Sequence, residues 1–193
     1  MGPTVFSGSV RAGHWIDGGA IRKGGMPGFL LRALLALLTC VALMGAVPMT
    51  TPKDDCEALL NAVLPLAEKF LNEHGEFYPF GATLGTDGKQ ALTAAHDGAD
   101  HSPSQPLIEL LRDGYRKGAK SGKLLATALA YDVLVVPPGE TAKVDAVAVE
   151  LDHRADYSEV VFFPYKIDSG KVEFGSAFVN AGEQAVFGKS QGP

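Results

Sequence analysis

Two histidines and two aspartates stand close together in the segment 96–101, which reads HDGADH. Neutral imidazole and carboxylate are both common ligands of divalent metals, so this segment has the chemistry of a metal site. The residues concerned are His96, Asp97, Asp100 and His101. Their spacing differs from that of the H-E-x-x-H zinc motif, and the glycine, serine and proline around them are typical of a solvated loop. A metal-dependent hydrolase is one hypothesis for this segment, and an ordinary polar loop is the other.

A second group consists of carboxylates on segments that read as neighbouring strands. Its members are Asp132, Asp145, Glu150, Asp152 and Glu159. Two carboxylates that meet across a strand pair can act as a general acid and a general base. Polar residues that alternate with apolar ones, however, normally occupy the open face of a half-exposed sheet. We therefore expect these carboxylates to face solvent.

Basic residues recur at four-residue spacing in the segment 106–120, as Arg112, Arg116 and Lys120. On a helix this spacing places them on one face, where they can contact an acidic partner or an anionic membrane surface. A solvated helix face is the alternative interpretation.

Aromatic residues surround a proline at the start of a predicted strand. Phe77, Tyr78 and Phe80 flank Pro79, and proline in a strand is typical of an edge or a bulge. Such an edge can accept a partner strand, although core packing also explains aromatic rings. A pocket between sheet and helices, lined by Phe77, Tyr78, Tyr131 and Phe163, is a further hypothesis and would bind a small ligand.

The sequence contains neither a glycine-rich phosphate-binding loop nor a G-x-S-x-G nucleophile motif. Cys56 lies on an apolar helical stripe, where we expect an inert, buried thiol. The isoelectric point of about 5.5 argues against a nucleic-acid-binding protein. No cofactor is predicted.

The pattern of apolar residues predicts the elements that position these groups. Helical spacing covers 52–73, with Thr51 and Asp54 as a capping box and Pro65 as an expected kink or break. A second helix is predicted from Pro106 to about 118. Strands are predicted at 77–84, 90–95, 124–136, 144–153, 159–166, 172–180 and, as a short tail strand, 185–188.

The order of the main elements is α-β-β-α-β-β-β, extended by further strand signals at the C-terminus, and it predicts an α+β fold. We expect a single antiparallel sheet of five to six strands with two helices packed on one face. This domain spans 50–188 and is followed by a flexible tail, 189–193.

The residues that precede the domain differ from it in charge and hydropathy. Residues 1–48 carry a net charge of +3, whereas residues 49–193 carry −8. We interpret 1–28 as a disordered basic leader and 29–49 as a hydrophobic segment. That segment fits a signal anchor or a cleaved signal peptide, and the protein is then membrane-anchored or exported. Alternatively, translation starts at Met49 and the protein is cytoplasmic.

The body resembles a group of small bacterial α+β proteins. The resemblance rests on FYPFG (77–81), AYDV (130–133), ELDHR (150–154) and FFPY (162–165), and it covers about residues 49–188. It implies no activity, cofactor or functional residue. The order of elements is also similar to that of profilin-like and roadblock-type modules, which are mostly regulatory or binding folds.

Together these observations favour a non-enzymatic binding or regulatory module that acts through a protein partner or through self-association. Small acidic α+β proteins of this kind include immunity proteins, which neutralise a toxin by surface complementarity. A membrane contact is expected only through residues 29–49. The metal-dependent hydrolase and the small-ligand-binding domain are the alternatives.

Overall fold

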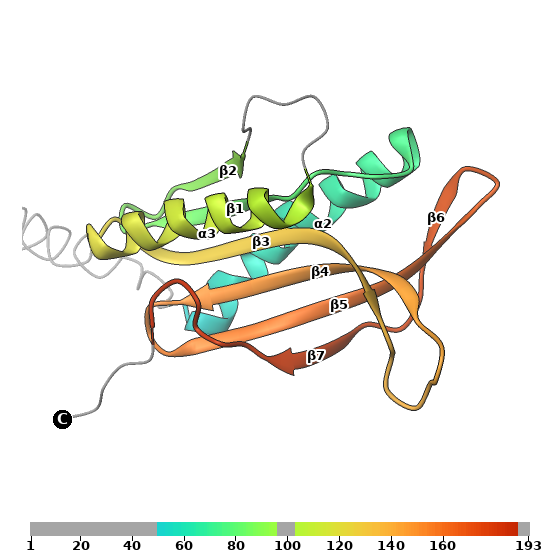
Figure 1. Ribbon diagram of the computed structural model, residues 1–193. Coiled ribbons are helices and arrows are strands. Elements are labelled where there is room, and N and C mark those ends of the chain that lie inside the picture. The colour runs from blue at the N-terminus through green and yellow to red at the C-terminus, as the bar shows by residue number, and fades with distance from the viewer. Residues whose placement is uncertain (1–49, 96–102, 189–193) are drawn as a thin grey trace, which may run out of the picture. The chain divides into compact units, whose positions relative to one another are not determined.

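A computed structural model describes residues 50–95 and 103–188, which form two helices and seven strands (Figure 1). The predicted metal residues His96, Asp97, Asp100 and His101 lie outside the described residues, as do the leader, the hydrophobic segment and the tail. Within 50–95 and 103–188, neither helix has the length and apolar character needed to cross a membrane.

Helix α2 spans Pro52–His74 and begins at the predicted capping box. The Thr51 side chain accepts a hydrogen bond from the Asp54 amide, and the Asp54 carboxylate accepts one from the Thr51 amide in return. Gly75, with φ of 76°, ends the helix in the left-handed conformation that glycine adopts readily. The helix runs uninterrupted through Pro65, which lies on its exposed side, where the Asn61 carbonyl can bond to water.

A β-hairpin follows, made of β1 (Phe80–Gly85) and β2 (Gln90–Ala94). Gly88 has φ of 77° in the turn, and the Gly85 amide donates to the Lys89 carbonyl at 2.8 Å. The Asp87-Gly88 turn signal is therefore confirmed. The prediction that a strand begins at residue 77 and lies at an edge of the sheet is wrong in two respects. The proline-containing segment 77–79 precedes the strand, and β1 lies between β2 and β3.

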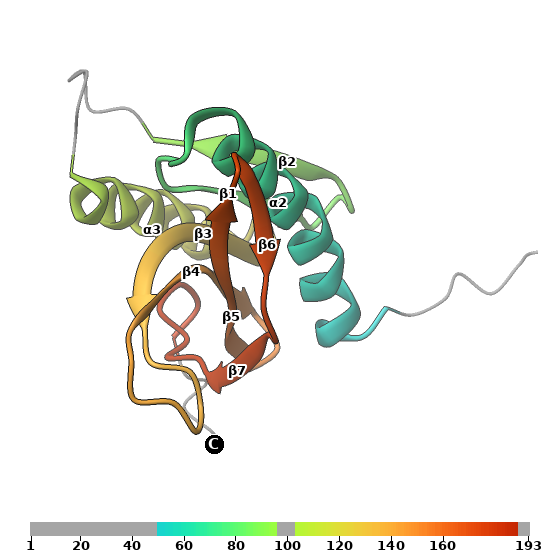
Figure 2. The ribbon, with the colours of Figure 1, turned by 90° about the vertical axis from the view of Figure 1, so that its right-hand side faces the viewer.

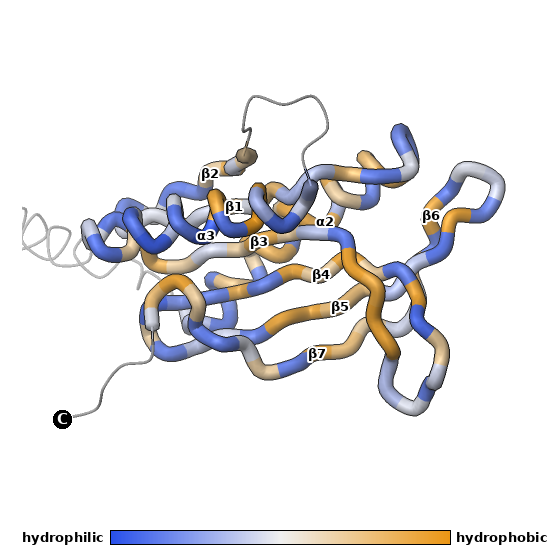
Figure 3. Tube along the Cα trace, in the orientation of Figure 1, coloured by the Kyte–Doolittle hydropathy of each residue, from blue (hydrophilic) through white to orange (hydrophobic). Residues whose placement is uncertain are grey.

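The remaining elements are α3 (Ser104–Lys120), β3 (Leu124–Val135), β4 (Val144–His153), β5 (Tyr157–Asp168), β6 (Lys171–Phe174) and β7 (Phe178–Ala181). The strands form one antiparallel sheet in the order β2-β1-β3-β4-β5-β6, and β7 also pairs with β5. The predicted α+β class with an antiparallel sheet is confirmed. Figure 3 shows that apolar residues concentrate in the central strands.

The two helices cover opposite faces of the sheet, and this corrects the expectation that they share one face (Figure 2). Ala126, Ala128 and Ala130 of β3 pack in the core beneath α2, whereas Leu129 packs with the buried residues of α3. Alternate residues of a strand point to opposite faces, so β3 is covered on both sides. This explains why β3 is a continuous apolar run rather than an alternating one.

The C-terminal strands differ from the prediction as well. The segment 172–180 forms two strands, with β6 paired to the end of β5 and β7 paired to its beginning. The pairing is interrupted at Pro164, whose carbonyl accepts from the Gly175 amide at 2.7 Å but whose nitrogen has no hydrogen to donate. Residues 185–187 form a turn, not the predicted tail strand.

Candidate functional site

A pocket of about 380 Å³ lies on the face of the sheet that α3 covers. Its floor comes from β3, β4, β5 and β7, its wall from α3, and its cover from the segment 182–186. The residues that define it are Arg112, Tyr115 and Arg116 of α3, Thr127 and Leu129 of β3, Glu150 and Asp152 of β4, Ser158, Val160 and Phe162 of β5, Asn180 of β7, and Glu183, Ala185 and Val186.

The pairing register brings three small polar side chains into one row across the floor. Thr127 on β3 is opposite Asp152 on β4, and Asp152 is opposite Ser158 on β5. Directly opposite residues of paired strands project from the same face of the sheet. Thr127 and Asp152 are both buried, so the floor carries polar groups that are largely covered.

Asp152 is the most unusual residue of this row, because only 5% of it is exposed. Its Oδ2 atom accepts a hydrogen bond from the Val186 amide at 2.7 Å. Its Oδ1 atom is buried and makes no hydrogen bond within the described part of the chain. Burial raises the pKa of Asp152, and the neighbouring Val186 amide and Ser158 hydroxyl oppose this effect only in part.

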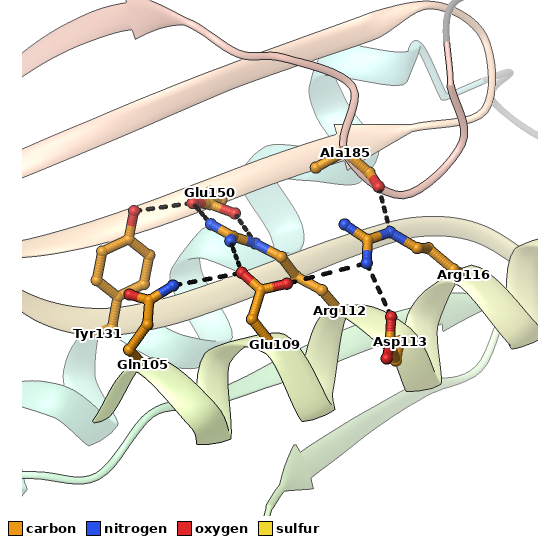
Figure 4. A network of polar contacts seen from close by, with 8 residues as sticks. All are labelled: Gln105, Glu109, Arg112, Asp113, Arg116, Tyr131, Glu150 and Ala185. Carbon is orange, nitrogen blue, oxygen red and sulfur yellow. Dashed lines mark hydrogen bonds and ion pairs between the residues drawn. The ribbon is translucent and has the colours of Figure 1, made fainter. Parts of the chain in front are cut away.

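An ion pair between α3 and β4 forms the wall of the pocket next to this row (Figure 4). Arg112 donates to both carboxylate oxygens of Glu150. Its Nε atom lies 3.2 Å from Oε2, and its Nη2 atom contacts Oε1. Nη1 of Arg112 also donates to Glu109 at 2.6 Å. Burial alone would lower the pKa of Arg112, but these two carboxylates outweigh it and raise the value.

Tyr131 completes the network from β3, since its hydroxyl donates to Oε1 of Glu150 at 2.8 Å. Burial raises the pKa of Tyr131, and the nearby Glu150 carboxylate raises it further, so the hydroxyl keeps its proton at neutral pH. The arrangement neutralises Arg112 and Glu150 internally. It supplies rigidity to the wall rather than a free acid or base.

The cover of the pocket is attached by several bonds. Nε of Arg116 donates to the Ala185 carbonyl at 2.8 Å, and its Nη1 lies 2.8 Å from Asp113 (Figure 4). The Gln184 amide donates to the Ser158 hydroxyl at 3.2 Å. Together with the bond from Val186 to Asp152, these contacts hold the segment 182–186 over the floor.

The structure separates the two sets of predicted partner-binding residues. Arg112 and Arg116 belong to the pocket just described and are held by carboxylates, while Lys120 lies in the last turn of α3. Phe77, Tyr78 and Phe80 line a different groove. Phe77 and Phe80 are buried there, and Tyr78 is half-exposed.

The aromatic groove has a volume of about 1010 Å³ and lies between the end of α2, the start of β1 and the start of α3. Tyr131 and Phe163 take no part in it, because Tyr131 projects toward α3 and Phe163 packs on the α2 side. The hypothesis of one ligand pocket lined by Phe77, Tyr78, Tyr131 and Phe163 is therefore wrong, because these four residues do not line a common pocket.

A histidine and a carboxylate meet beneath the first turn of α2. Nε2 of His153 lies 3.3 Å from Oδ2 of Asp55, and Nδ1 of His153 accepts the Ala155 amide at 3.0 Å. The proton is consequently on Nε2 in the neutral ring. The neighbouring Cys56 is buried, and burial followed by nearby carboxylates raises the pKa of its thiol to about 12. This confirms the prediction of a buried cysteine, and the thiol carries its proton at neutral pH.

Sequence reasoning missed the role of Glu150 and Asp152, which we expected to face solvent. Both are largely covered, because α3 and the segment 182–186 lie over this face of the sheet. The available signal was the continuous apolar run of β3, which indicates a strand buried on both faces. Because β4 pairs with β3, its side chains on the α3 side lie next to Arg112 of α3 and the segment 182–186.

No protein-family model matches the chain, and comparison with curated proteins and with solved structures gives no match either. The fold and the site therefore define a class only: an α+β protein with an open antiparallel sheet, one helix on each face, and a partly open polar pocket beneath the second helix.

Proposed function

We propose that the protein is a non-enzymatic binding module that acts through protein–protein contacts, and that it binds a second copy of itself along the outer edge of β2. The observation that carries this proposal is the edge itself. Within the described residues, β2 pairs with β1 on one side and with no strand on the other. Its sequence, QALTA, has no charged residue. Exposed edge strands in natural proteins usually carry charges or prolines that prevent such pairing.

The backbone of β2 presents bonding groups to this edge. The bond from the Gly85 amide to the Lys89 carbonyl sets the alternation of the ladder between β1 and β2. Lys89, Ala91 and Thr93 direct their amide and carbonyl groups toward β1. Leu92, at the centre of the strand, directs its amide and carbonyl groups toward the open edge, and Gln90 and Ala94 do the same.

A second β2 strand fits this edge in the antiparallel direction. A two-fold axis at Leu92 places it opposite Leu92 of the partner subunit and places Gln90 opposite Ala94 of the partner subunit. Leu92 is 60% exposed, so its side chain is available for the cross-strand contact. The absence of charge in the strand avoids repulsion between two copies of an acidic protein.

The expected dimer is weak, because one pair of five-residue strands buries less surface than the roughly 1,200 Å² of a standard interface. A dissociation constant of about 1–100 μM is expected for so small an interface, and sedimentation velocity from about 1 to 300 μM covers this range. The full chain should shift from monomer to dimer across it.

Two proline variants test the assignment. Leu92→Pro removes an amide that points to the open edge and leaves the bonds to β1 in place, so it should abolish the dimer. Val179→Pro is the matched control on β7. Val179 is 55% exposed, and the bond from the Gly182 amide to the Ser158 carbonyl places the Val179 amide on the outer side of β7.

Far-UV circular dichroism verifies that both variants fold. A dimer that persists in Leu92→Pro, or a wild-type chain that stays monomeric at 300 μM, contradicts the proposal. Loss of the dimer in Val179→Pro alone would assign the contact to the opposite edge of the sheet and would equally contradict it.

A further inference from the structure

The pocket beneath α3 contains positive charges that are already compensated. Arg112 lies between the carboxylates of Glu150 and Glu109, and Arg116 lies against Asp113 and the Ala185 carbonyl. Each guanidinium thus has its counter-charge within the protein. Neither leaves a full positive charge for an anionic ligand.

The pocket also contains a negative group that is not compensated. Asp152 is buried, and within 50–95 and 103–188 no ion pair forms with its carboxylate. Its Oδ2 atom is occupied by the Val186 amide, whereas its Oδ1 atom has no hydrogen-bond partner in the described residues. A buried acceptor without a partner is costly, and it is satisfied when a ligand brings a donor.

The surroundings of Asp152 define what kind of donor fits. The hydroxyls of Thr127 and Ser158 stand on either side of it in the same row, so three oxygen-bearing side chains lie together. An ammonium group has one positive charge and three donors. The charge matches the uncompensated carboxylate of Asp152, and a charge-assisted bond to its Oδ1 atom is strong. The Ser158 hydroxyl already accepts the Gln184 amide, so the Thr127 hydroxyl is the second acceptor that this row offers. Leu129, Val160 and Phe162 line the rest of the pocket and suit a short alkyl chain.

From this arrangement we infer that the pocket beneath α3 binds a small primary amine, with its ammonium group bonded to Oδ1 of Asp152 and its alkyl part against Leu129 and Val160. A volume of about 380 Å³ lies within the range of small-molecule sites, roughly 300–1,000 Å³. Glu183, which is exposed and also lines the pocket, adds negative charge on the segment that covers it. This inference does not depend on pairing through β2.

The experiment is a titration of the full, ¹⁵N-labelled chain with n-butylamine hydrochloride, followed by amide NMR at pH 7. The amide resonance of Val186 reports directly on the site, because it donates to Asp152. We expect saturable shifts of this resonance at millimolar amine. The uncharged isostere n-butanol and the anion butyrate, at the same concentrations, should bind at least tenfold more weakly, since one charge-assisted bond contributes about that factor or more.

Asp152→Asn is the decisive variant, because the amide keeps an acceptor for Val186 and removes the charge. We expect it to weaken n-butylamine binding by about tenfold or more. Asp145→Asn is the matched control: it removes one carboxylate from the same strand, but Asp145 is exposed and projects from the opposite face. Its affinity should stay within about twofold of wild type.

The inference is overturned if n-butylamine leaves the Val186 resonance unchanged, or if the two variants bind the amine equally. The comparison of amine with alcohol uses wild-type protein only. Equal binding of n-butylamine and n-butanol would therefore overturn the inference even if Asp152→Asn did not fold.

Discussion

The ion pair between Arg112 and Glu150 leads to a prediction about which partner matters more for stability. Both side chains are about four-fifths covered, with 19% and 20% of their surfaces exposed. Arg112 has a second carboxylate in Glu109, whereas the partners of Glu150 within residues 50–95 and 103–188 are Arg112 and the hydroxyl of Tyr131. Arg112→Met therefore leaves a buried carboxylate without a cation, while Glu150→Gln leaves a guanidinium that is still paired.

The magnitudes follow from this asymmetry. Removing one partner of a fully buried pair costs about 3–5 kcal/mol. Residual exposure and the bond from Tyr131 reduce this, so we expect Arg112→Met to lower the free energy of unfolding by about 2–3 kcal/mol. Glu150→Gln should lower it by about 1 kcal/mol, because the amide oxygen still accepts bonds from Arg112 and Tyr131.

The double variant completes a thermodynamic cycle. Once Arg112 is absent, Glu150→Gln removes an unpaired buried charge, so the double variant should cost at least about 1 kcal/mol less than the sum of the single variants. Urea unfolding of the full chain, followed by far-UV circular dichroism, measures all four proteins. Lys53→Met is the control, since the pair of Lys53 and Glu57 is exposed and should contribute less than about 0.5 kcal/mol.

Two results would refute this reasoning. One is a cost for Glu150→Gln equal to or greater than the cost for Arg112→Met, which would mean that Glu109 does not compensate the guanidinium. The other is strict additivity in the double variant, which would mean that the two side chains do not interact energetically.

Three further predictions concern positions where the backbone, a thiol or a buried acid is decisive. Gly81→Ala should lower the free energy of unfolding by about 3 kcal/mol in the same urea assay, because the new Cβ would collide with the Ala128 carbonyl. Gly114 on α3 has open space around it, so Gly114→Ala should raise the free energy of unfolding by about 0.5–1 kcal/mol. Cys56 is buried and its thiol keeps its proton, so it should resist a thiol reagent at pH 8 until the protein is unfolded. Peptide mass spectrometry measures the modification, and modification of Cys56 in the native state would contradict its burial. Burial raises the pKa of Asp152, so the folded protein holds this proton more tightly than the unfolded chain and loses stability as the pH rises through the ordinary value of about 4. Asp152→Asn should consequently be more stable than wild type at pH 7, by on the order of 1 kcal/mol. Near pH 3, where Asp152 is protonated in both the folded and the unfolded protein, the difference should vanish. A variant that is less stable than wild type at pH 7 would contradict the raised pKa.

Local signals in the sequence predicted the elements well. The capping box at Thr51, the turn at Gly88 and the strands predicted at 124–136 and 144–153 all depend on neighbouring residues. The structure confirms them, with the first strand ending one residue earlier, at Val135. Pro164 also interrupts pairing by a local property, its missing amide hydrogen, but the affected strand lies elsewhere in the sequence. The division of 172–180 into two strands therefore escaped prediction.

The candidate site was predicted less well, because it depends on which face of the sheet each helix covers. The spacing of Arg112 and Arg116 is equally consistent with a solvated stripe, and the alternation of 144–153 is equally consistent with an open sheet face. Only the position of α3 against β3 and β4 turns both patterns inward and joins Arg112 to Glu150.

The sequence by itself determined the class of fold, since hydrophobic periodicity, caps and turns act over a few residues and require no knowledge of the rest of the chain. The tertiary structure alone decided that α3 lies opposite α2, that β2 is the outermost strand among the described residues, and that Asp152 is buried beneath the segment 182–186. The physical reason is that burial of a polar residue is set by contacts between segments distant in the sequence, and the residue type carries no record of them.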